Sequence, residues 1–220
     1  MRKIWLLATV LAVSPVPALG QTSEELNSDG KNTENVLTQS MGLDRKSYSP
    51  LAQINKSNIK RLVPVWSTSL MNDLGELAAP VIHDGVIYAI NAKWTFAIDV
   101  ETGHQIWRTP VQTEPSMTRA GSAIYRGAPA IYDGKLFRVT VDNHLVALEM
   151  KTGRVLWNRK FAEWKEGYHS SGAPIVVNGV LISGVLSCGL RSVPASLQTA
   201  PVSCVKSKAR TESRDTVPRN

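Results

Sequence analysis

One phrase occurs three times along this chain of 220 residues. Each copy has Ala-Pro, a short apolar run, an Asp-Gly or Asn-Gly pair, and a second β-rich run. The copies are APVIHDGVIYAI (79–90), APAIYDGKLFRVT (128–140) and APIVVNGVLISG (173–184). A second phrase lies between them, as AIDVETGHQIW (97–107) and ALEMKTGRVLW (147–157). Repeats of 40–50 residues constrain the fold more than any other feature, because they indicate a repeat architecture.

Both phrases predict β-hairpins. Asp-Gly and Asn-Gly pairs supply the positive-φ residues of tight hairpins, and Thr102-Gly103 and Thr152-Gly153 fit a longer hairpin loop with glycine in the left-handed position. Each repeat is therefore expected to form four antiparallel strands, which is one blade of a β-propeller. Trp107 and Trp157 are expected on the outermost strands, where each covers the seam to the next blade. The alternative is an all-β sandwich whose turns happen to be alike.

The predicted fold class is all-β, a partial β-propeller of about two and a half blades over residues 41–185. Residues 21–40 are polar and without periodicity, so we expect a flexible N-terminal segment. Asn58 to Leu62 are expected to form a short helical turn.

The composition changes abruptly after Val185, in the middle of a repeat. Residues 186–220 contain no aromatic residue and no Asp-Gly or Asn-Gly pair, and Ser, Arg, Lys, Pro and Thr dominate. We expect this aberrant basic tail to be disordered, and we interpret it as the product of a frameshift near codon 186. The alternative is a genuine, short, basic extension.

The first residues, MRKIWLLATVLAVSPVPALGQ, have a basic start, an apolar run and a small-residue end. This pattern predicts a cleaved secretory signal peptide over 1–20 and a periplasmic location. The apolar run is too short to span a bilayer, and no other stretch could do so, so the mature chain is expected to have no transmembrane segment. The alternative is an uncleaved anchor.

The net charge of +7 does not indicate a nucleic-acid partner. Arg2 and Lys3 carry two of these charges and residues 186–220 carry a net four, which leaves about +1 for the body of the chain. No basic, aromatic-interleaved face of the kind that binds phosphates is present in the sequence. Export would permit a disulfide between Cys188 and Cys204, but we interpret this pair in the odd tail as coincidence.

The phrases YSPLAQINKSNIKRLVPVW, AIDVETGHQIW, ALEMKTGRVLW and GAPIVVNGVLISG together resemble the N-terminal part of the quinoprotein alcohol dehydrogenases, which include the methanol dehydrogenases. The resemblance covers roughly residues 36–185. It implies an eight-bladed propeller that holds pyrroloquinoline quinone (PQQ) on its axis, with a calcium or lanthanide ion as Lewis acid. The implied reaction is oxidation of a primary alcohol by hydride transfer to PQQ, with electrons passed to cytochrome c or a membrane quinone.

The resemblance implies three cofactor-binding residues. Arg126 matches the family's pocket arginine, and a guanidinium suits the carboxylates and quinone oxygens of PQQ. Ser171 matches a hydroxyl that hydrogen-bonds the cofactor, and Thr140 lies at a strand end near the expected axis. The alternatives are an arginine on a surface strand and an ordinary loop serine.

The departures from the family pattern concern the catalytic groups. Leu77, beside Glu76, stands where the family often has glutamate, and Gly121-Ser122 replaces a cysteine pair. No acidic residue lies between Glu166 and Glu212, so the expected metal-ligand glutamate is missing. No catalytic or metal-binding residue is therefore assigned. We expect a truncated PQQ-dependent dehydrogenase that is itself inactive. The alternatives are a non-enzymatic periplasmic scaffold and one chain of a split enzyme.

Overall fold

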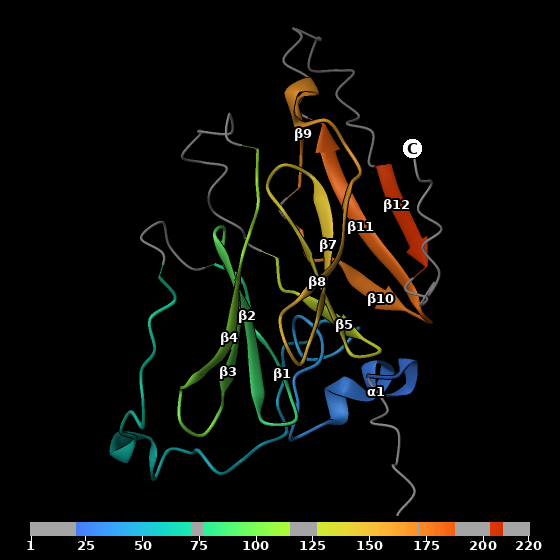
Figure 1. Cartoon of the computed structure of the whole chain (residues 1–220). Helices are drawn as coiled ribbons and strands as arrows, with labels where there is room; N and C mark the ends of the chain where they lie inside the picture. The colour runs from blue at the N-terminus through green and yellow to red at the C-terminus, as the bar shows by residue number, and fades with distance from the viewer. Residues whose placement is uncertain (1–20, 72–76, 115–126, 171, 188–202, 209–220) are drawn as a thin grey trace, which may run out of the picture.

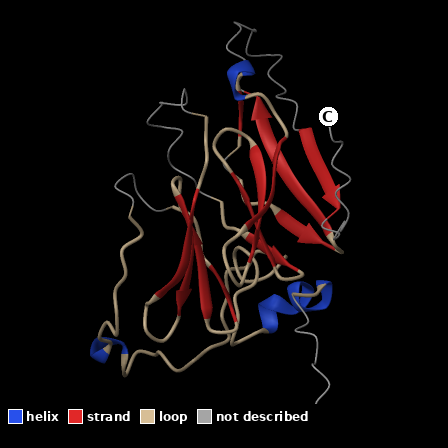
Figure 2. Ribbon diagram, in the orientation of Figure 1, coloured by secondary structure: helices blue, strands red, loops and turns tan. Residues whose placement is uncertain are grey.

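Three antiparallel sheets form the molecule in the computed structural model, which describes residues 21–71, 77–114, 127–170, 172–187 and 203–208. Figure 1 shows the sheets in chain order across the molecule, and Figure 2 shows that helix is confined to short pieces at its periphery. The described residues contain no helix long and apolar enough to cross a membrane.

The first two sheets are complete four-stranded blades, which we call blade 1 and blade 2. Their strands pair in chain order, each with its neighbour, as the repeat predicted. Blade 1 consists of β1 (Val81–His83), β2 (Val86–Ile90), β3 (Trp94–Asp99) and β4 (Gln105–Pro110). Blade 2 consists of β5 (Ala130–Tyr132), β6 (Lys135–Val139), β7 (His144–Glu149) and β8 (Val155–Lys160).

The two blades share their register as well as their topology. Ala97 pairs with Trp107 in blade 1 and Ala147 pairs with Trp157 in blade 2, and the register shifts by one residue directly after both pairs. The 50-residue repeat of the sequence is therefore a repeat of the structure down to the position of its β-bulge.

The predicted hairpin turns are confirmed. Asp84-Gly85, Asp133-Gly134 and Asn178-Gly179 all have positive φ at both residues, between 47° and 74°. This is the two-residue turn whose twist matches that of the strands it joins. Gly103 and Gly153, with φ of 71° and 72°, take the left-handed position of the longer turns.

Tryptophans dock each blade onto its neighbour. The Trp107 indole of β4 donates a hydrogen bond to the Met150 carbonyl of blade 2 at 2.9 Å, and a Cβ on Gly153 would lie 2.4 Å from its ring. Trp66 makes the same contacts with blade 1, since its indole bonds the Val100 carbonyl at 2.9 Å and its ring lies against Gly103. The predicted seam contact is confirmed for Trp107.

The third sheet contains a strand that sequence reasoning did not predict. Its strands are β9 (Tyr168–His169), β10 (Ile175–Val177), β11 (Val180–Ser187) and β12 (Ser203–Lys208). β12 pairs antiparallel with Val180–Val185 of β11. The disorder expected for residues 186–220 stays a prediction, and of this tail the structure describes only 186–187 and 203–208. β12 pairs with the edge of β11 opposite β10. An open strand edge presents a row of N–H and C=O groups that can pair with another segment, even one whose sequence has no strand signal.

Residues 21–40, for which a flexible segment is expected, contain regular structure. Residues Ser23–Ser28 form helix α1, and a 3-10 turn follows at Asp29–Lys31. A capping box begins the helix, because the Thr22 hydroxyl accepts the Glu25 N–H and the Glu25 carboxylate accepts the Thr22 N–H. Six helical residues are too few to show a periodic pattern, although Thr-x-x-Glu was a readable start signal. The short helical turn expected from Asn58 to Leu62 is confirmed as a 3-10 turn at Ile59–Arg61.

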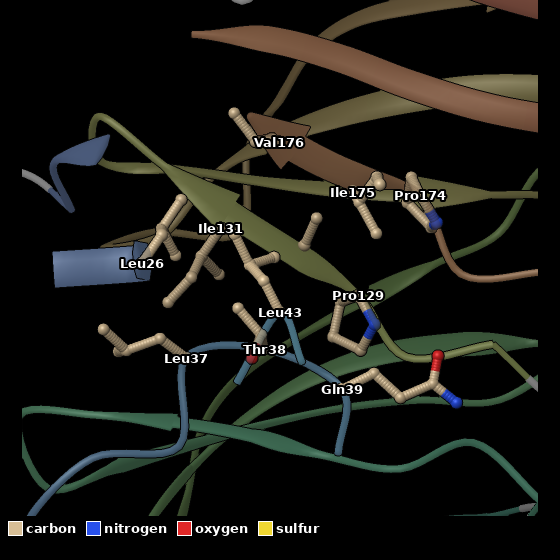
Figure 3. Close-up of a pocket in the computed structure, with 11 residues that line it drawn as sticks. Leu26, Leu37, Thr38, Gln39, Leu43, Pro129, Ile131, Pro174, Ile175 and Val176 are labelled. Atoms are coloured by element: carbon tan, nitrogen blue, oxygen red, sulfur yellow. The ribbon is translucent and has the colours of Figure 1, made fainter. Parts of the chain in front are cut away.

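The N-terminal segment packs across the inner strands. The Gln21 carbonyl accepts a hydrogen bond from the Asp133 N–H at 3.0 Å, and Val36 forms an antiparallel bridge with Ile82. Leu26 and Leu37 are 2% and 1% exposed. Figure 3 shows them beside residues of β5 and β10, around a cavity of about 20 Å³. That volume is about the size of one water molecule, so the cavity is a packing defect and not a cofactor site.

Candidate functional site

The predicted site residues and their described neighbours lie at one end of the blades. Ala130 of β5 pairs with Phe137 of β6, so the residues before β5 lie beside those after β6. The β2–β3 turn of blade 1 lies at the corresponding end, by the same topology. We call this end the polar rim. It consists of the turns 91–93 and 140–143, together with residues 127–129 and 172–174 that precede β5 and β10.

Two of the three predicted cofactor residues, Arg126 and Ser171, lie outside the described residues. The residues that directly follow them are described. A Cβ on Gly127 would lie 2.5 Å from the Ala173 nitrogen and 2.7 Å from the Gly172 carbonyl carbon. The backbones before β5 and β10 are therefore in direct contact at the polar rim, and only glycine permits this approach.

The third predicted residue, Thr140, closes the β6–β7 turn. It is 1% exposed, and its hydroxyl donates to Asp142 Oδ1 and accepts the His144 N–H at 2.9 Å. A hydroxyl has one donor and two acceptor positions, so one acceptor position remains for another partner. These bonds give Thr140 a structural role, and its contact with a cofactor stays a prediction.

The same turn holds two buried polar residues that sequence reasoning missed. Asp142 Oδ2 accepts the Glu114 N–H at 3.0 Å, which ties the chain after blade 1 to the rim. Asn143 is fully buried with φ of 61°, and its Nδ2 donates to the Tyr168 carbonyl at 2.8 Å. Within the described residues its Oδ1 has no hydrogen-bond partner. A buried, unpaired carbonyl oxygen at the rim is an acceptor available to a ligand or a water. The adjacent Asp-Asn pair was the available signal.

Beneath the rim, Arg138 of β6 connects blade 2 to blade 1. It is 2% exposed, and its guanidinium donates to the Asn91 carbonyl at 2.7 Å, the Trp94 carbonyl at 2.8 Å and the Thr95 hydroxyl at 2.9 Å. It also lines a cavity of about 210 Å³ between the blades. A charged residue inside an apolar strand was a signal of this contact, and sequence reasoning did not use it.

Ionisable side chains beside the rim form surface ion pairs. Lys160 Nζ lies 2.6 Å from Glu163 Oε2 and 3.3 Å from Glu114 Oε1. The hydrogen bond from Lys160 lowers the pKa of Glu163, and the same bond raises the pKa of Lys160. These groups stay charged at neutral pH, and each is paired with an opposite charge of the same cluster.

The rim has the character of a polar binding surface and not of a metal centre. Within the described part of the chain, no three His, Cys, Asp or Glu side chains lie close enough together to hold a metal ion. The close backbone contact at Gly127 and the unpaired Asn143 oxygen suit a flat ligand with polar edges. Among the described residues, the rim thus offers polar groups to a ligand and no cluster of metal ligands.

Comparisons with known proteins agree with this arrangement. A family model described as "Glucose/ethanol/alcohol dehydrogenase, beta-propeller domain" (PQQ) matches residues 39–185. The quinoprotein alcohol dehydrogenase PedH of Pseudomonas putida is 39% identical over 167 residues, which are 74% of this chain and 28% of that protein. The 1-butanol dehydrogenase (quinone) of Thauera butanivorans is 40% identical over 178 residues, which are 78% of this chain and 28% of that protein.

A solved structure gives the same result. A europium-containing methanol dehydrogenase superposes with a TM-score of 0.67 at 27% identity, over 74% of this chain and 29% of that one. The chain thus spans a little more than a quarter of the length of the proteins it matches.

Proposed function

This chain belongs to the glucose/ethanol/alcohol dehydrogenase β-propeller family, and we propose that its polar rim is one sector of a PQQ-binding site in an alcohol dehydrogenase. The observation that carries the proposal is the backbone contact between Gly127 and Gly172–Ala173. Arg126 and Ser171, the two residues that match cofactor contacts of the family, directly precede these touching segments in the sequence.

Each residue has a distinct proposed role. Arg126 binds the carboxylates or quinone oxygens of the cofactor, since a guanidinium forms charge-assisted, often bidentate bonds with such groups. Ser171 donates a hydrogen bond to the cofactor. Thr140 holds the β6–β7 turn in place through Asp142 and His144, and so fixes Asn143 at the rim. When bound, PQQ supplies the hydride acceptor for alcohol oxidation.

The metal and the electron acceptor are proposed only as classes. The family resemblance favours calcium or a lanthanide, but no described residue is assigned to it. Relatives named as quinone-linked and as cytochrome c-linked 1-butanol dehydrogenases support either acceptor. The basic and apolar start of the sequence supports export to the periplasm.

The test is cofactor binding by the purified chain, measured by equilibrium dialysis against PQQ without added metal. Binding is the appropriate readout, because the described residues offer no metal ligand set. We expect Arg126→Gln to weaken PQQ binding by about 10- to 100-fold, the loss of a charge-assisted hydrogen bond. Arg154→Gln is the matched control, since this arginine is 66% exposed on the β7–β8 turn. Absence of PQQ binding, or equal affinity in both variants, would contradict the proposal.

A further inference from the structure

The seam between blades 1 and 2 contains a cavity of about 210 Å³ that lies apart from the proposed cofactor site. Its walls are β3, β4 and the residues after β4 on one side, and β6, β7 and β8 on the other. β4 and β8 are the strands of each sheet farthest from the inner strands β1 and β5. Figure 1 shows the two sheets side by side, and none of the residues that define the polar rim lines the cavity.

The lining of this seam cavity combines polar and apolar side chains. Arg138 and Thr95 are 2% and 1% exposed, so both polar groups are buried. Leu148 and Val146 provide buried apolar surface beside them. Val155, the first residue of β8, is 45% exposed and lies where the cavity meets the solvent. A site lined in this way suits a small molecule with a hydrocarbon body and one polar group.

The Thr95 hydroxyl offers a hydrogen-bond donor to such a molecule. Its oxygen accepts a hydrogen bond from Arg138 Nη1 at 2.9 Å. Within the described residues, its own O–H group has no acceptor. A hydroxyl has one donor position, and a buried donor without an acceptor costs free energy. The cavity therefore favours a ligand that places an acceptor oxygen beside Thr95.

The charge of Arg138 determines which kind of oxygen the cavity prefers. A guanidinium stays protonated in proteins, and three of its bonds here go to neutral oxygens of Asn91, Trp94 and Thr95. None of the described residues that line the cavity is acidic. A negatively charged oxygen gains more from a nearby guanidinium than a neutral one does. The acceptor that fits both Arg138 and Thr95 is thus a carboxylate oxygen.

We propose that the seam cavity binds a small monocarboxylate, with its carboxylate toward Arg138 and Thr95 and its hydrocarbon part against Val146 and Leu148. A cavity of about 150 Å³ accommodates benzene, so one of this volume accommodates a molecule of the size of benzoate. The ligand contacts both blades at once, and it therefore stabilises the folded chain by mass action. This inference does not depend on PQQ binding.

Titration of the purified full chain with benzoate, followed by ¹H–¹⁵N NMR, tests the proposal. We expect saturable shifts of the amide signals of Thr95, Val146 and Leu148, with a dissociation constant on the order of 1 mM for so small a ligand. Benzyl alcohol has the same ring and no charge. It should bind at least about tenfold more weakly, because it lacks the charge-assisted bond.

A pair of tryptophan variants places the binding site in the seam. Val155→Trp should weaken benzoate binding at least about tenfold, because the larger side chain fills the opening of the cavity. Ile106→Trp is the matched control, since Ile106 is 47% exposed on β4 and does not line the cavity. Benzoate should raise the melting temperature of the control variant and not that of Val155→Trp, with equal sodium chloride as the reference.

The comparison of benzoate with benzyl alcohol needs no variant, so it decides the question even where Val155→Trp does not fold. Absence of saturable shifts up to about 20 mM benzoate would overturn the proposal. So would equal affinity for benzyl alcohol, or equal weakening by the two tryptophan variants. Failure of the chain to bind PQQ would leave each of these expected results unchanged.

Discussion

At the residue scale, the seam between blades depends on a glycine that the tryptophan approaches more closely than any side chain allows. Gly153 and Gly134 have nearly the same left-handed φ, 72° and 69°. A Cβ on Gly153 would lie 2.4 Å from the Trp107 ring, whereas nothing lies within 4 Å of one on Gly134. Substitutions at these two positions therefore separate the energetic cost of backbone strain from that of a packing clash.

The pair gives a direct prediction. Gly134→Ala should lower the free energy of unfolding by about 1–2 kcal/mol, the cost of a left-handed alanine. Gly153→Ala should cost this amount and in addition displace the Trp107 ring, so its loss should be clearly larger. Urea unfolding followed by tryptophan fluorescence measures both. Equal losses would show that the ring does not pack on Gly153.

The Thr-Gly turns also predict a dependence of stability on pH. Asp99 Oδ1 accepts hydrogen bonds from the Thr102 hydroxyl at 2.7 Å and the Thr102 N–H at 2.8 Å, and these bonds lower its pKa below the ordinary 3.8. The bond from the Thr152 hydroxyl lowers the pKa of Glu149 in the same way. A lowered pKa in the folded chain stabilises it above the unfolded value, and this stabilisation is lost as the pH falls through the folded value.

We therefore expect the urea midpoint of the chain to fall as the pH drops below about 4. Asp99→Asn removes the titrating group from one turn. Its midpoint should be lower than that of the unaltered chain at pH 7, and the difference should shrink toward pH 3. A difference that stays constant across this range would contradict the assignment.

At the scale of elements, Arg138 links β6 to blade 1 through the β2–β3 turn and the start of β3. Its three oxygen partners all belong to blade 1. Arg138→Met keeps the length of the side chain but leaves buried acceptors without this donor, which should cost about 2–3 kcal/mol of unfolding free energy. Arg154→Met, at an exposed site, should cost less than about 0.5 kcal/mol. Thermal unfolding of the two variants measures the difference, and similar losses would contradict a link between blades.

The elements of blades 1 and 2 could be predicted because their signals are local. Asp84-Gly85 and Thr102-Gly103 specify their own turns, and the apolar runs between them have only one way to pair. Helix α1 and β12 were missed for different reasons. α1 is too short for periodicity and is stabilised by its cap and by Leu26, whose partners lie in distant strands. β12 is held by the free edge of β11, and its own sequence gives no strand signal.

The candidate site was predictable only as far as family motifs reach. Arg126, Ser171 and Thr140 were found by their resemblance to those motifs. Asn143 and Arg138 depend on contacts across a turn and across a seam, with Tyr168 and with Asn91. Neither contact has a signature in the neighbouring residues, because burial of a polar side chain is a property of the packed blades and not of one strand.

At the scale of the whole molecule, the described residues form three antiparallel sheets in chain order. Closure is what removes exposed edges from a propeller. The described residues form one sector of such an arrangement, in which the seam between blades 1 and 2 joins Trp107 of the outermost strand of one to the Thr-Gly turn of the next.

The docking of the N-terminal segment affects when its native contacts can form during synthesis of the chain. Gln21 bonds to Gly134, 113 positions later in the chain, and Leu26 lies with Val176 around one cavity. A ribosome makes residues 21–43 well before β5 and β10, on which they dock. These early residues are thus among the later ones to reach their native contacts, because contacts so distant in sequence form slowly. Until the inner strand β10 has been made, Leu26 lacks its neighbour Val176, and a chaperone that recognises apolar segments has that interval in which to bind it.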